Sequence, residues 1–167
     1  MDGVLADFEG TISKIAGVPF NTLSRREVRE LSSSDGFFRN LLPTRDFGHL
    51  IQHIHEHIDC DVCILSATGS SDSLRIFEEK NKWLDEWYNQ YPLSGRYFVH
   101  HSEEKRYYAS SRSLLIDDRL KSVEPFIRKG GHGILHTDSF TTVHRLKEIF
   151  GYYGDESVDE KGSGEES

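Results

Sequence analysis

Apolar residues along this chain form two kinds of pattern, short continuous runs and longer stripes at helical spacing. The runs, which are typical of strands buried on both faces, cover residues 61–67, 96–99, 114–116 and 133–136. Helical stripes separate or follow them: over about 72–91, in a segment with Pro125 in its first turn, and in a closing segment capped by Thr141 or Thr142. This alternation predicts an α/β fold in which a parallel sheet carries helices on both faces.

The first eight residues predict the end of one further buried strand, because a short apolar run there leads into a loop that carries a carboxylate. Residues 9–59 have no strand pattern. Ser24 and Glu27 form a capping-box pattern that opens a short polar helix. Asp46 can cap a second helix, whose apolar stripe consists of Phe47, Leu50, Ile51, Ile54 and Ile58.

Two groups of potential metal ligands favour a structural interpretation. His49, His53 and His57 follow one another at four-residue spacing on the Asp46 helix, on a line that runs from the side opposite the apolar stripe round to its edge, so a solvated face is expected. Cys60 and Cys63 have Cys-x-x-Cys spacing, but no second pair exists and the segment enters a strand. We interpret both cysteines as small residues, buried or half-buried, at a strand start.

The formal net charge is −8, and residues 151–167 contribute −5 of it through six acidic residues against Lys161. The remaining chain therefore carries −3, a poor match for polymeric nucleic acid, whose binding depends on neutralising phosphates with Lys and Arg. A single nucleotide remains compatible with this charge. No apolar run approaches the roughly 18 residues of a membrane span, so we expect a cytoplasmic protein without a membrane partner.

Carboxylates follow two of the predicted strands. Asp2 lies in the first segment, and Asp117 and Asp118 end the run 114–116. Ligands of open α/β sheets bind at the carboxyl ends of parallel strands, so these groups are candidates for one site. Three carboxylates in one place repel each other unless a cation holds them, and Mg²⁺ prefers such oxygen ligands.

These residues resemble motifs one and four of the haloacid dehalogenase-like (HAD) phosphohydrolases. More narrowly, residues 2–8 resemble the pattern Asp-Met-Asp-Gly-Val-Leu-Ala-Asp-Phe of the 5'(3')-deoxyribonucleotidases. The resemblance implies a HAD-like Rossmannoid α/β domain over 1–153. It implies a small helical cap at about 9–45, a core that resumes over about 46–153, and an acidic tail at 154–167 that we expect to be disordered.

The chain departs from that pattern at one position. The first Asp of the pattern is the family's nucleophile, and it would stand just before Met1, together with most of the first strand. A start assigned too late, a fragment of a longer protein and a catalytically dead descendant would each account for this. We expect the chain that begins at Met1 to be inactive or poorly folded.

By resemblance, Asp2 is the acid–base residue, which protonates the leaving oxygen and then activates water. Its backbone carbonyl also binds the metal. Asp117 is implied as a direct Mg²⁺ ligand, and Asp118 as a residue that acts through water or orients the ligand shell.

The phosphate-binding residues are also implied by the resemblance. Ser66 matches the hydroxyl that donates to a phosphoryl oxygen, with the amides of Ala67 and Thr68 nearby. Lys105 is the best match for the catalytic lysine that neutralises phosphate and nucleophile, although its spacing to Asp117 is slightly longer than expected. Arg106 is the alternative to Lys105.

Phe8, Phe37 and Phe38 are candidates for stacking on a nucleobase, since stacking tolerates different bases. For Phe37 and Phe38, packing in the core of the cap is an equal alternative. Lys80 and Lys82 match a family segment of the form Lys-x-Arg-Trp. We interpret them as part of a solvated helix face, and a position at the site is the alternative.

The sequence therefore predicts a Mg²⁺-dependent phosphomonoester hydrolase. The expected substrate is a nucleoside monophosphate, cleaved through an aspartyl-phosphate as in a 5'(3')-deoxyribonucleotidase. A HAD phosphatase of another small phosphomonoester, or a HAD-like binding module without catalytic activity, are the alternatives. Base preference, sugar preference and a homodimer are left open.

Overall fold

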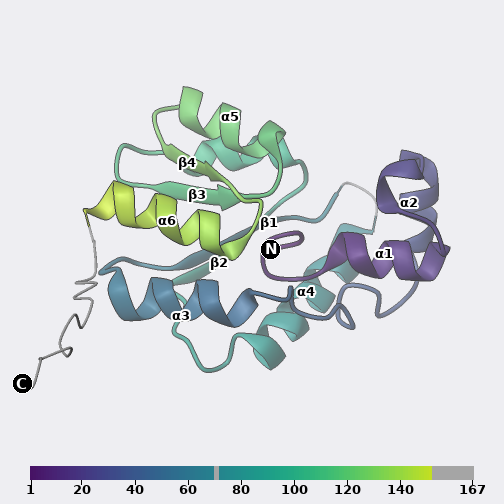
Figure 1. Ribbon diagram of the computed structural model, residues 1–167. Helices are drawn as coiled ribbons and strands as arrows, with labels where there is room; N and C mark the ends of the chain where they lie inside the picture. Colours follow the sequence, from purple (N-terminus) through teal and green to yellow (C-terminus); the bar gives the residue numbers. More distant parts are fainter. Residues whose placement is uncertain (70–71, 152–167) are drawn as a thin grey trace, which may run out of the picture.

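The computed structural model describes residues 1–69 and 72–151, and its strands form two parallel pairs (Figure 1). Strand β1 (Cys63–Ala67) pairs with β2 (Gly95–Val99), and β3 (Leu114–Asp117) pairs with β4 (His132–Leu135). All four fall on the apolar runs, so the strand predictions are confirmed. The single parallel sheet that the sequence predicts is, however, divided into two separate pairs.

Helices lie on both sides of the strands (Figure 1). Helix α5 packs on β3 and β4, and α6 packs on β4 and α3. The described α-helices are α1 (Phe8–Ala16), α2 (Arg25–Leu31), α3 (Phe47–His57), α4 (Ser73–Trp87), α5 (Leu120–Arg128) and α6 (Ser139–Phe150). Two 3₁₀ segments join them, η1 (Phe20–Thr22) and η2 (Ser102–Tyr108). The architecture is therefore mixed α/β with parallel strands.

The predicted strand end in the first eight residues is wrong. Gly3 has a φ of 75°, and the carbonyl oxygen of Met1 accepts from the amides of Val4, Leu5 and Ala6. This local turn uses the hydrogen bonds that a strand would offer to a neighbour. Only isolated bridges remain, from Ala6 to Asp2 and to Pro43.

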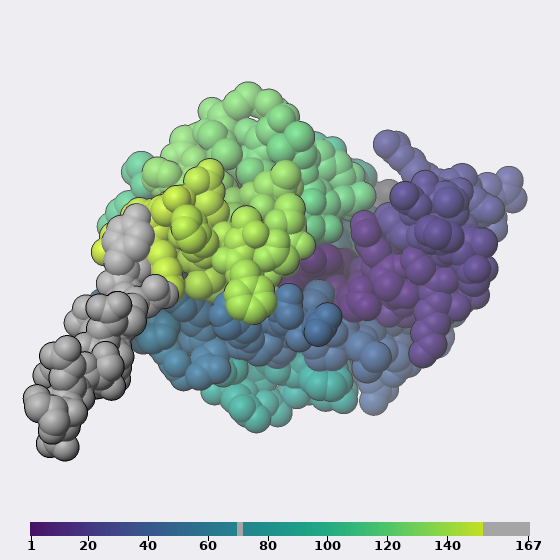
Figure 2. Space-filling model, viewed as in Figure 1, coloured from purple at the N-terminus to yellow at the C-terminus, as the bar shows by residue number. Residues whose placement is uncertain are grey.

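The region that follows is helical, as predicted, and forms a lobe beside the strand layers (Figures 1 and 2). Asp7 caps α1 by accepting from the amide of Gly10. The capping box of Ser24 and Glu27 at the start of α2 is confirmed. This lobe consists of α1, η1, α2 and the turn that leads back to α3.

Helix α3 buries the predicted apolar stripe, with Leu50 and Ile51 almost fully inaccessible. Helix α4 differs from its prediction. The apolar spacing puts Leu74, Phe77, Leu84, Trp87 and Tyr91 on one inward face, but Leu74 and Phe77 are exposed. Its inward face instead carries Glu79, Lys80, Trp83 and Leu84. The apolar periodicity misplaced this face because two of its four inward residues are charged and find partners inside the protein.

Within the described ranges, no helix has the length and apolar character needed to cross a membrane. The predicted disorder of 154–167 concerns residues outside those ranges.

Candidate active site

Polar side chains from five separate segments converge where β1 and β3 end. Asp2 comes from the N-terminal turn, Ser66 from β1, Asp117 from β3, Lys80 from α4 and Lys105 from η2. All except Asp2 are buried, with exposed fractions of 5% or less. The carboxyl ends of the strands therefore form a buried charged cluster, the place where open α/β sheets bind ligands.

Lys80 connects the N-terminal turn to β1. Its Nζ lies 2.6 Å from Oδ2 of Asp2, 3.0 Å from Oγ of Ser66 and 2.7 Å from the carbonyl oxygen of Ala67. The residue has an exposed fraction of 0%, so its three donor positions are all used by these acceptors. Because Ser66 accepts from Lys80, its own hydroxyl proton remains available to a ligand.

The interpretation of Lys80 as a solvated residue is thus wrong, whereas Lys82 is exposed as predicted. The error has a physical reason. A lysine on an inward helix face is disfavoured unless a partner compensates its desolvation, and this partner, Asp2, is 78 residues away in the sequence. The matching family segment was the signal that could have identified Lys80.

Lys105 and Asp117 form a second buried ion pair. The Nζ of Lys105 donates to Oδ2 of Asp117 at 2.5 Å, and the amide of Arg119 donates to Oδ1 at 3.0 Å. Sequence order alone put Lys105 before this strand, and the structure brings the two residues into contact. Arg106, the alternative, is exposed and lies over the ring of Tyr107.

Asp118 lies against the backbone of Gly3. A Cβ atom at Gly3 would stand 2.1 Å from Oδ2 of Asp118, so a larger residue at this position would displace the carboxylate from its place. Burial, followed by the neighbouring charge of Asp117, raises the pKa of Asp118 to about 6. Asp118 is therefore the carboxylate of the cluster that most lacks a compensating cation.

The two ion pairs set the charges of the cluster. Burial alone would raise the pKa of Asp2, but the Lys80 ammonium, the Met1 amine and Lys105 together outweigh it, and the pKa lies below its ordinary value. Burial and then Lys105 act in the same opposed way on Asp117, whose pKa is also lowered. Burial lowers the pKa of Lys80 despite its pairing with Asp2. Both aspartates are thus held as carboxylates.

The main-chain nitrogen of Met1 belongs to the same cluster. Burial, followed by the positive charge of Lys105, lowers the pKa of the Met1 amine to about 6, while Asp2 and Asp117 oppose this shift. The first backbone atom of the chain therefore lies among the charged side chains.

The donor set fits a magnesium ion in part. Oδ1 of Asp2 is buried and has no hydrogen-bond partner, and Asp118 forms no salt bridge in the described part of the chain. Mg²⁺ is usually held by one or two carboxylates together with water and substrate phosphate, rather than by a complete protein cage. Across residues 1–69 and 72–151, no three His, Cys, Asp or Glu side chains converge as a metal-binding group. Asp2 and Asp118 are the two carboxylates with oxygen atoms to offer.

The backbone amides of the turn after β1 are less available to a ligand than the sequence suggests. The amide of Thr68 donates to the carbonyl of Val99, and that of Gly69 to the carbonyl of His100. Both amides extend the pairing with β2 and are not directed to a ligand, which corrects the expectation for Thr68. Ser66 itself lies at the cluster, and residues 70 and 71 lie outside the described ranges.

The three phenylalanines pack together beside Lys80. The rings of Phe8 and Phe38 are stacked at 6.0 Å, and Phe37 meets each of them edge to face. Phe37 and Phe38 are only 6% and 7% exposed, while Phe8 is half-buried. The Nζ of Lys80 lies 4.9 Å from the ring centre of Phe38. The aromatic cluster thus touches the charged one.

Glu79 ties the lobe to the same helix. Its carboxylate accepts from the amide of Gly36 at 2.8 Å and from the amide of Phe38 at 2.9 Å, and Arg75 donates to it at 2.7 Å. Consecutive residues of α4 therefore hold the aromatic turn and the charged cluster in a fixed relation.

No family model and no curated protein matches the chain. Among solved structures, a hydrolase from Streptococcus pneumoniae TIGR4 has a TM-score of 0.49 and 14% sequence identity, over 91% of this chain and 95% of the other. A likeness at this level says nothing about the reaction.

Proposed function

We propose that this chain is the core of a phosphomonoester hydrolase that uses Mg²⁺ and acts on nucleoside monophosphates. The observation that supports it most is the position of Lys80, which joins Asp2, Ser66 and the end of β1 beside the Lys105–Asp117 pair. Two buried ammonium groups and a hydroxyl suit a phosphoryl group, whose transfer depends on charge stabilisation and positioning.

The substrate phosphate competes with Asp2 for Lys80. When the ammonium moves towards a phosphoryl oxygen, Asp2 loses its counter-charge and burial raises its pKa. Asp2 can then carry the proton that the leaving alkoxide needs and can later accept one from water. Ser66 donates its hydroxyl proton to a phosphoryl oxygen, and Lys105 stabilises the negative charge from the side of β3.

The nucleophile in this proposal is an aspartate attached directly before Met1. Its carboxylate oxygen forms a bond to phosphorus while the bond to the leaving oxygen breaks, which gives an aspartyl-phosphate. The backbone carbonyl of Asp2 and the carboxylate of Asp118 would hold Mg²⁺, which supplies charge neutralisation at the phosphate and leaves the Asp2 side chain free for proton transfer. The nucleobase would meet the half-buried ring of Phe8, because Phe37 and Phe38 are largely covered.

A binding module without turnover is the second candidate. It is favoured by the ion pairs Lys80–Asp2 and Lys105–Asp117, because each aspartate is already paired with a lysine and the cluster could bind an anion without chemistry. The test supplies a panel of nucleoside monophosphates and a small phosphate ester to the chain extended by a strand and Asp before Met1. Phosphate release that is fastest for nucleotides supports the hydrolase, and nucleotide binding by calorimetry without release supports the binding module.

A further inference from the structure

One face of α4 holds residues 34–41, the part of the chain that leads from the lobe back towards α3. Arg75, Glu79 and Trp83 follow one another at four-residue spacing, which places them in one line along the helix. Arg75 donates to a carbonyl oxygen of this segment at 3.0 Å, and the indole nitrogen of Trp83 donates to another at 2.7 Å. Glu79 accepts from two of its amides. These bonds all go to backbone groups, so α4 fixes the path of the segment itself.

Glu79 is the middle contact of this line, and its two carboxylate oxygens have separate tasks. Oε1 accepts from the Gly36 amide and from Arg75, whereas Oε2 accepts from the Phe38 amide. Burial alone would raise the pKa of Glu79, but these donors outweigh it, and the pKa lies below its ordinary value. A glutamine has one acceptor oxygen in place of two, so it would turn an NH₂ group towards a donor. The carboxylate is therefore matched to this backbone turn.

The turn that Glu79 holds presents an aromatic ring to the charged cluster. The Nζ of Lys80 lies over the ring of Phe38, 4.9 Å from its centre. A cation in this position is attracted by the ring, and the attraction is larger where water is excluded, as it is around the fully buried Lys80. Neighbouring residues of α4 thus bind the Phe38 amide and meet the Phe38 ring.

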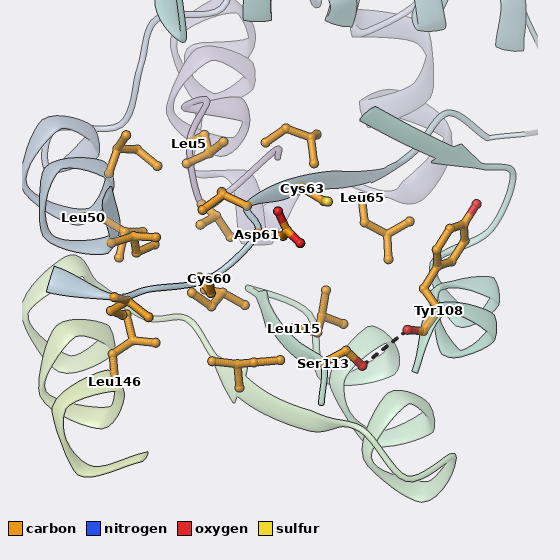
Figure 3. Close-up of a pocket in the computed structure, with 18 of the residues that line it drawn as sticks. Leu5, Leu50, Cys60, Asp61, Cys63, Leu65, Tyr108, Ser113, Leu115 and Leu146 are labelled. Carbon is orange, nitrogen blue, oxygen red and sulfur yellow. Dashed lines mark hydrogen bonds between the residues drawn. The ribbon is translucent and has the colours of Figure 1, made fainter. Parts of the chain in front are cut away.

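The other side of the cluster borders a cavity. This space of about 580 Å³ lies between the two strand pairs, and Figure 3 shows Leu5 of the N-terminal turn on one side of it and Leu115 of β3 on the other. Because the turn that carries Asp2 borders a cavity, it has fewer packing neighbours than a segment enclosed by the core. Movement of Asp2 away from Lys80 therefore meets less resistance than movement of Phe38, which is held by its backbone and by its buried ring.

We propose that Glu79 is the positioning residue of the Lys80 ammonium. Through the backbone of Phe38 it holds the ring against Nζ, and it thereby sets how strongly the cluster binds a phosphate. When a phosphoryl oxygen displaces Asp2, the ring stays in place and continues to stabilise the ammonium. The effect on phosphate binding rests on the proposed function, whereas the position of the ring against Lys80 does not.

The test compares Glu79→Gln with Glu78→Gln, which removes the same charge from an exposed neighbour. NMR measures the chemical shifts of the Lys80 Cε protons, which the Phe38 ring displaces, and calorimetry measures the Kd of inorganic phosphate. Phe38→Leu gives both values without the ring. We expect Glu79→Gln to move the Lys80 shifts most of the way to those of Phe38→Leu and to weaken phosphate binding by roughly 2- to 30-fold. Glu78→Gln should change neither quantity.

Parent values of the Lys80 shifts and of the Kd in Glu79→Gln would overturn the proposal. So would displaced Lys80 shifts with an unchanged Kd, because the ring would then have no influence on anion binding. A parent chain that binds no phosphate would contradict the proposed function, and the Lys80 shifts of Glu79→Gln then decide alone whether Glu79 positions the ammonium.

Arg75→Gln takes the place of Glu79→Gln should that variant fail to fold. The Arg75 side chain is 17% exposed, and its replacement removes the side-chain donor of Glu79. We expect the Lys80 shifts and the Kd to change in the same direction as in Glu79→Gln, by a smaller amount. Parent values of both in Arg75→Gln would overturn the proposal.

Discussion

The ammonium of Lys80 lies 2.6 Å from the carboxylate of Asp2, although 78 residues separate them in the sequence. Lys80 is inaccessible to solvent, and its charge is stabilised by Asp2, by two further oxygen acceptors on Ser66 and Ala67, and by the ring of Phe38. This contact joins the N-terminal turn, the end of β1 and the middle of α4, and the cluster depends on it.

Replacing Lys80 by methionine should destabilise the protein by about 1–3 kcal/mol, because the carboxylate of Asp2, whose Oδ1 is buried although the side chain is 27% exposed, is left without its counter-charge. Lys82→Met is the matched control on the same helix and should lie within about 0.5 kcal/mol of the parent, since Lys82 is exposed. Urea denaturation measures both. Adding Asp2→Asn to Lys80→Met should restore part of the loss, and a fully additive double variant would contradict the pairing.

Gly3→Ala should cost more than its backbone strain. Gly3 and Gly17 have φ values of 75° and 70°, so alanine at either position is strained by about 1 kcal/mol or more. Only at Gly3 does the new Cβ meet Asp118, at 2.1 Å. In an Asp118→Ala background, Gly3→Ala should therefore cost about as much as Gly17→Ala does in the parent. A cost unchanged by Asp118→Ala would show that the carboxylate is not the obstacle.

The order of the strands and the main participants of the cluster could be predicted from the sequence. Continuous apolar runs located the strands, and the family resemblance assigned Lys105, before the β3 run, to the site of Asp117, which it contacts in the structure. Lys80 could not be located by periodicity, because a buried lysine breaks the apolar pattern of its helix. Its partner is remote in sequence, and only the folded chain brings them together.

The prediction of a strand end at the N-terminus was wrong for a related reason. A short apolar run has the same appearance at the end of a strand and in a turn, and the positive φ of Gly3 decides between them. The division into two strand pairs could not be predicted from the sequence either, because pairing partners are set by tertiary contacts and not by the pattern within one strand.

The two adjacent carboxylates should differ in their effect on metal use. Asp117 is occupied by Lys105 and the Arg119 amide, whereas Asp118 forms no salt bridge in the described part of the chain. We therefore propose that their predicted roles are reversed and expect Asp118→Asn to raise the Mg²⁺ requirement more than Asp117→Asn does. A Mg²⁺ titration of phosphatase activity, in the chain with Asp before Met1, measures this. The opposite order would restore Asp117 as the direct ligand.

The aromatic cluster should divide into a core part and a contact part. Phe37→Ala and Phe38→Ala should each destabilise by about 3–5 kcal/mol, as truncations of buried phenylalanines do. Phe8→Ala should lower the rate with nucleotides by roughly 5- to 150-fold relative to a small phosphate ester, because stacking on one base contributes about 1–3 kcal/mol. Equal losses of Phe8→Ala on both substrates would place Phe8 in the core as well.

Low pH should destabilise the protein where β4 ends, because His136 becomes protonated there. Burial lowers its pKa from the ordinary 6.5, and Nδ1 lies 2.8 Å from Oγ1 of Thr142. The folded state therefore disfavours protonation of His136. Its contribution to the free energy of unfolding is fully present above about pH 6.5, the pKa of the unfolded state. Below that pH the contribution falls by up to ~1.4 kcal/mol per pH unit, until the pKa of the folded state is reached. His136→Gln should reduce this dependence by the share of His136, because the pKa values of His53 and His55 are also lowered, while His144→Gln, with a side chain 70% exposed, should leave it unchanged. Denaturation midpoints between pH 5 and pH 8, in steps of roughly half a unit, measure both variants; an identical pH profile for His136→Gln and the parent would contradict the assignment.

The central claim is that this cluster transfers a phosphoryl group to an aspartate before Met1. The direct measurement compares two extended chains. Both carry the same apolar strand before Met1, and the last added residue is Asp in one chain and Asn in the other. Each chain is incubated with Mg²⁺ and a deoxynucleoside monophosphate. The Asp chain should release phosphate and yield an acid-stable mass increase of one phosphoryl group on the added aspartate, and both should disappear in the Asn chain. Equal phosphate release by the two chains, or none from a folded Asp chain that binds the nucleotide, would contradict the account.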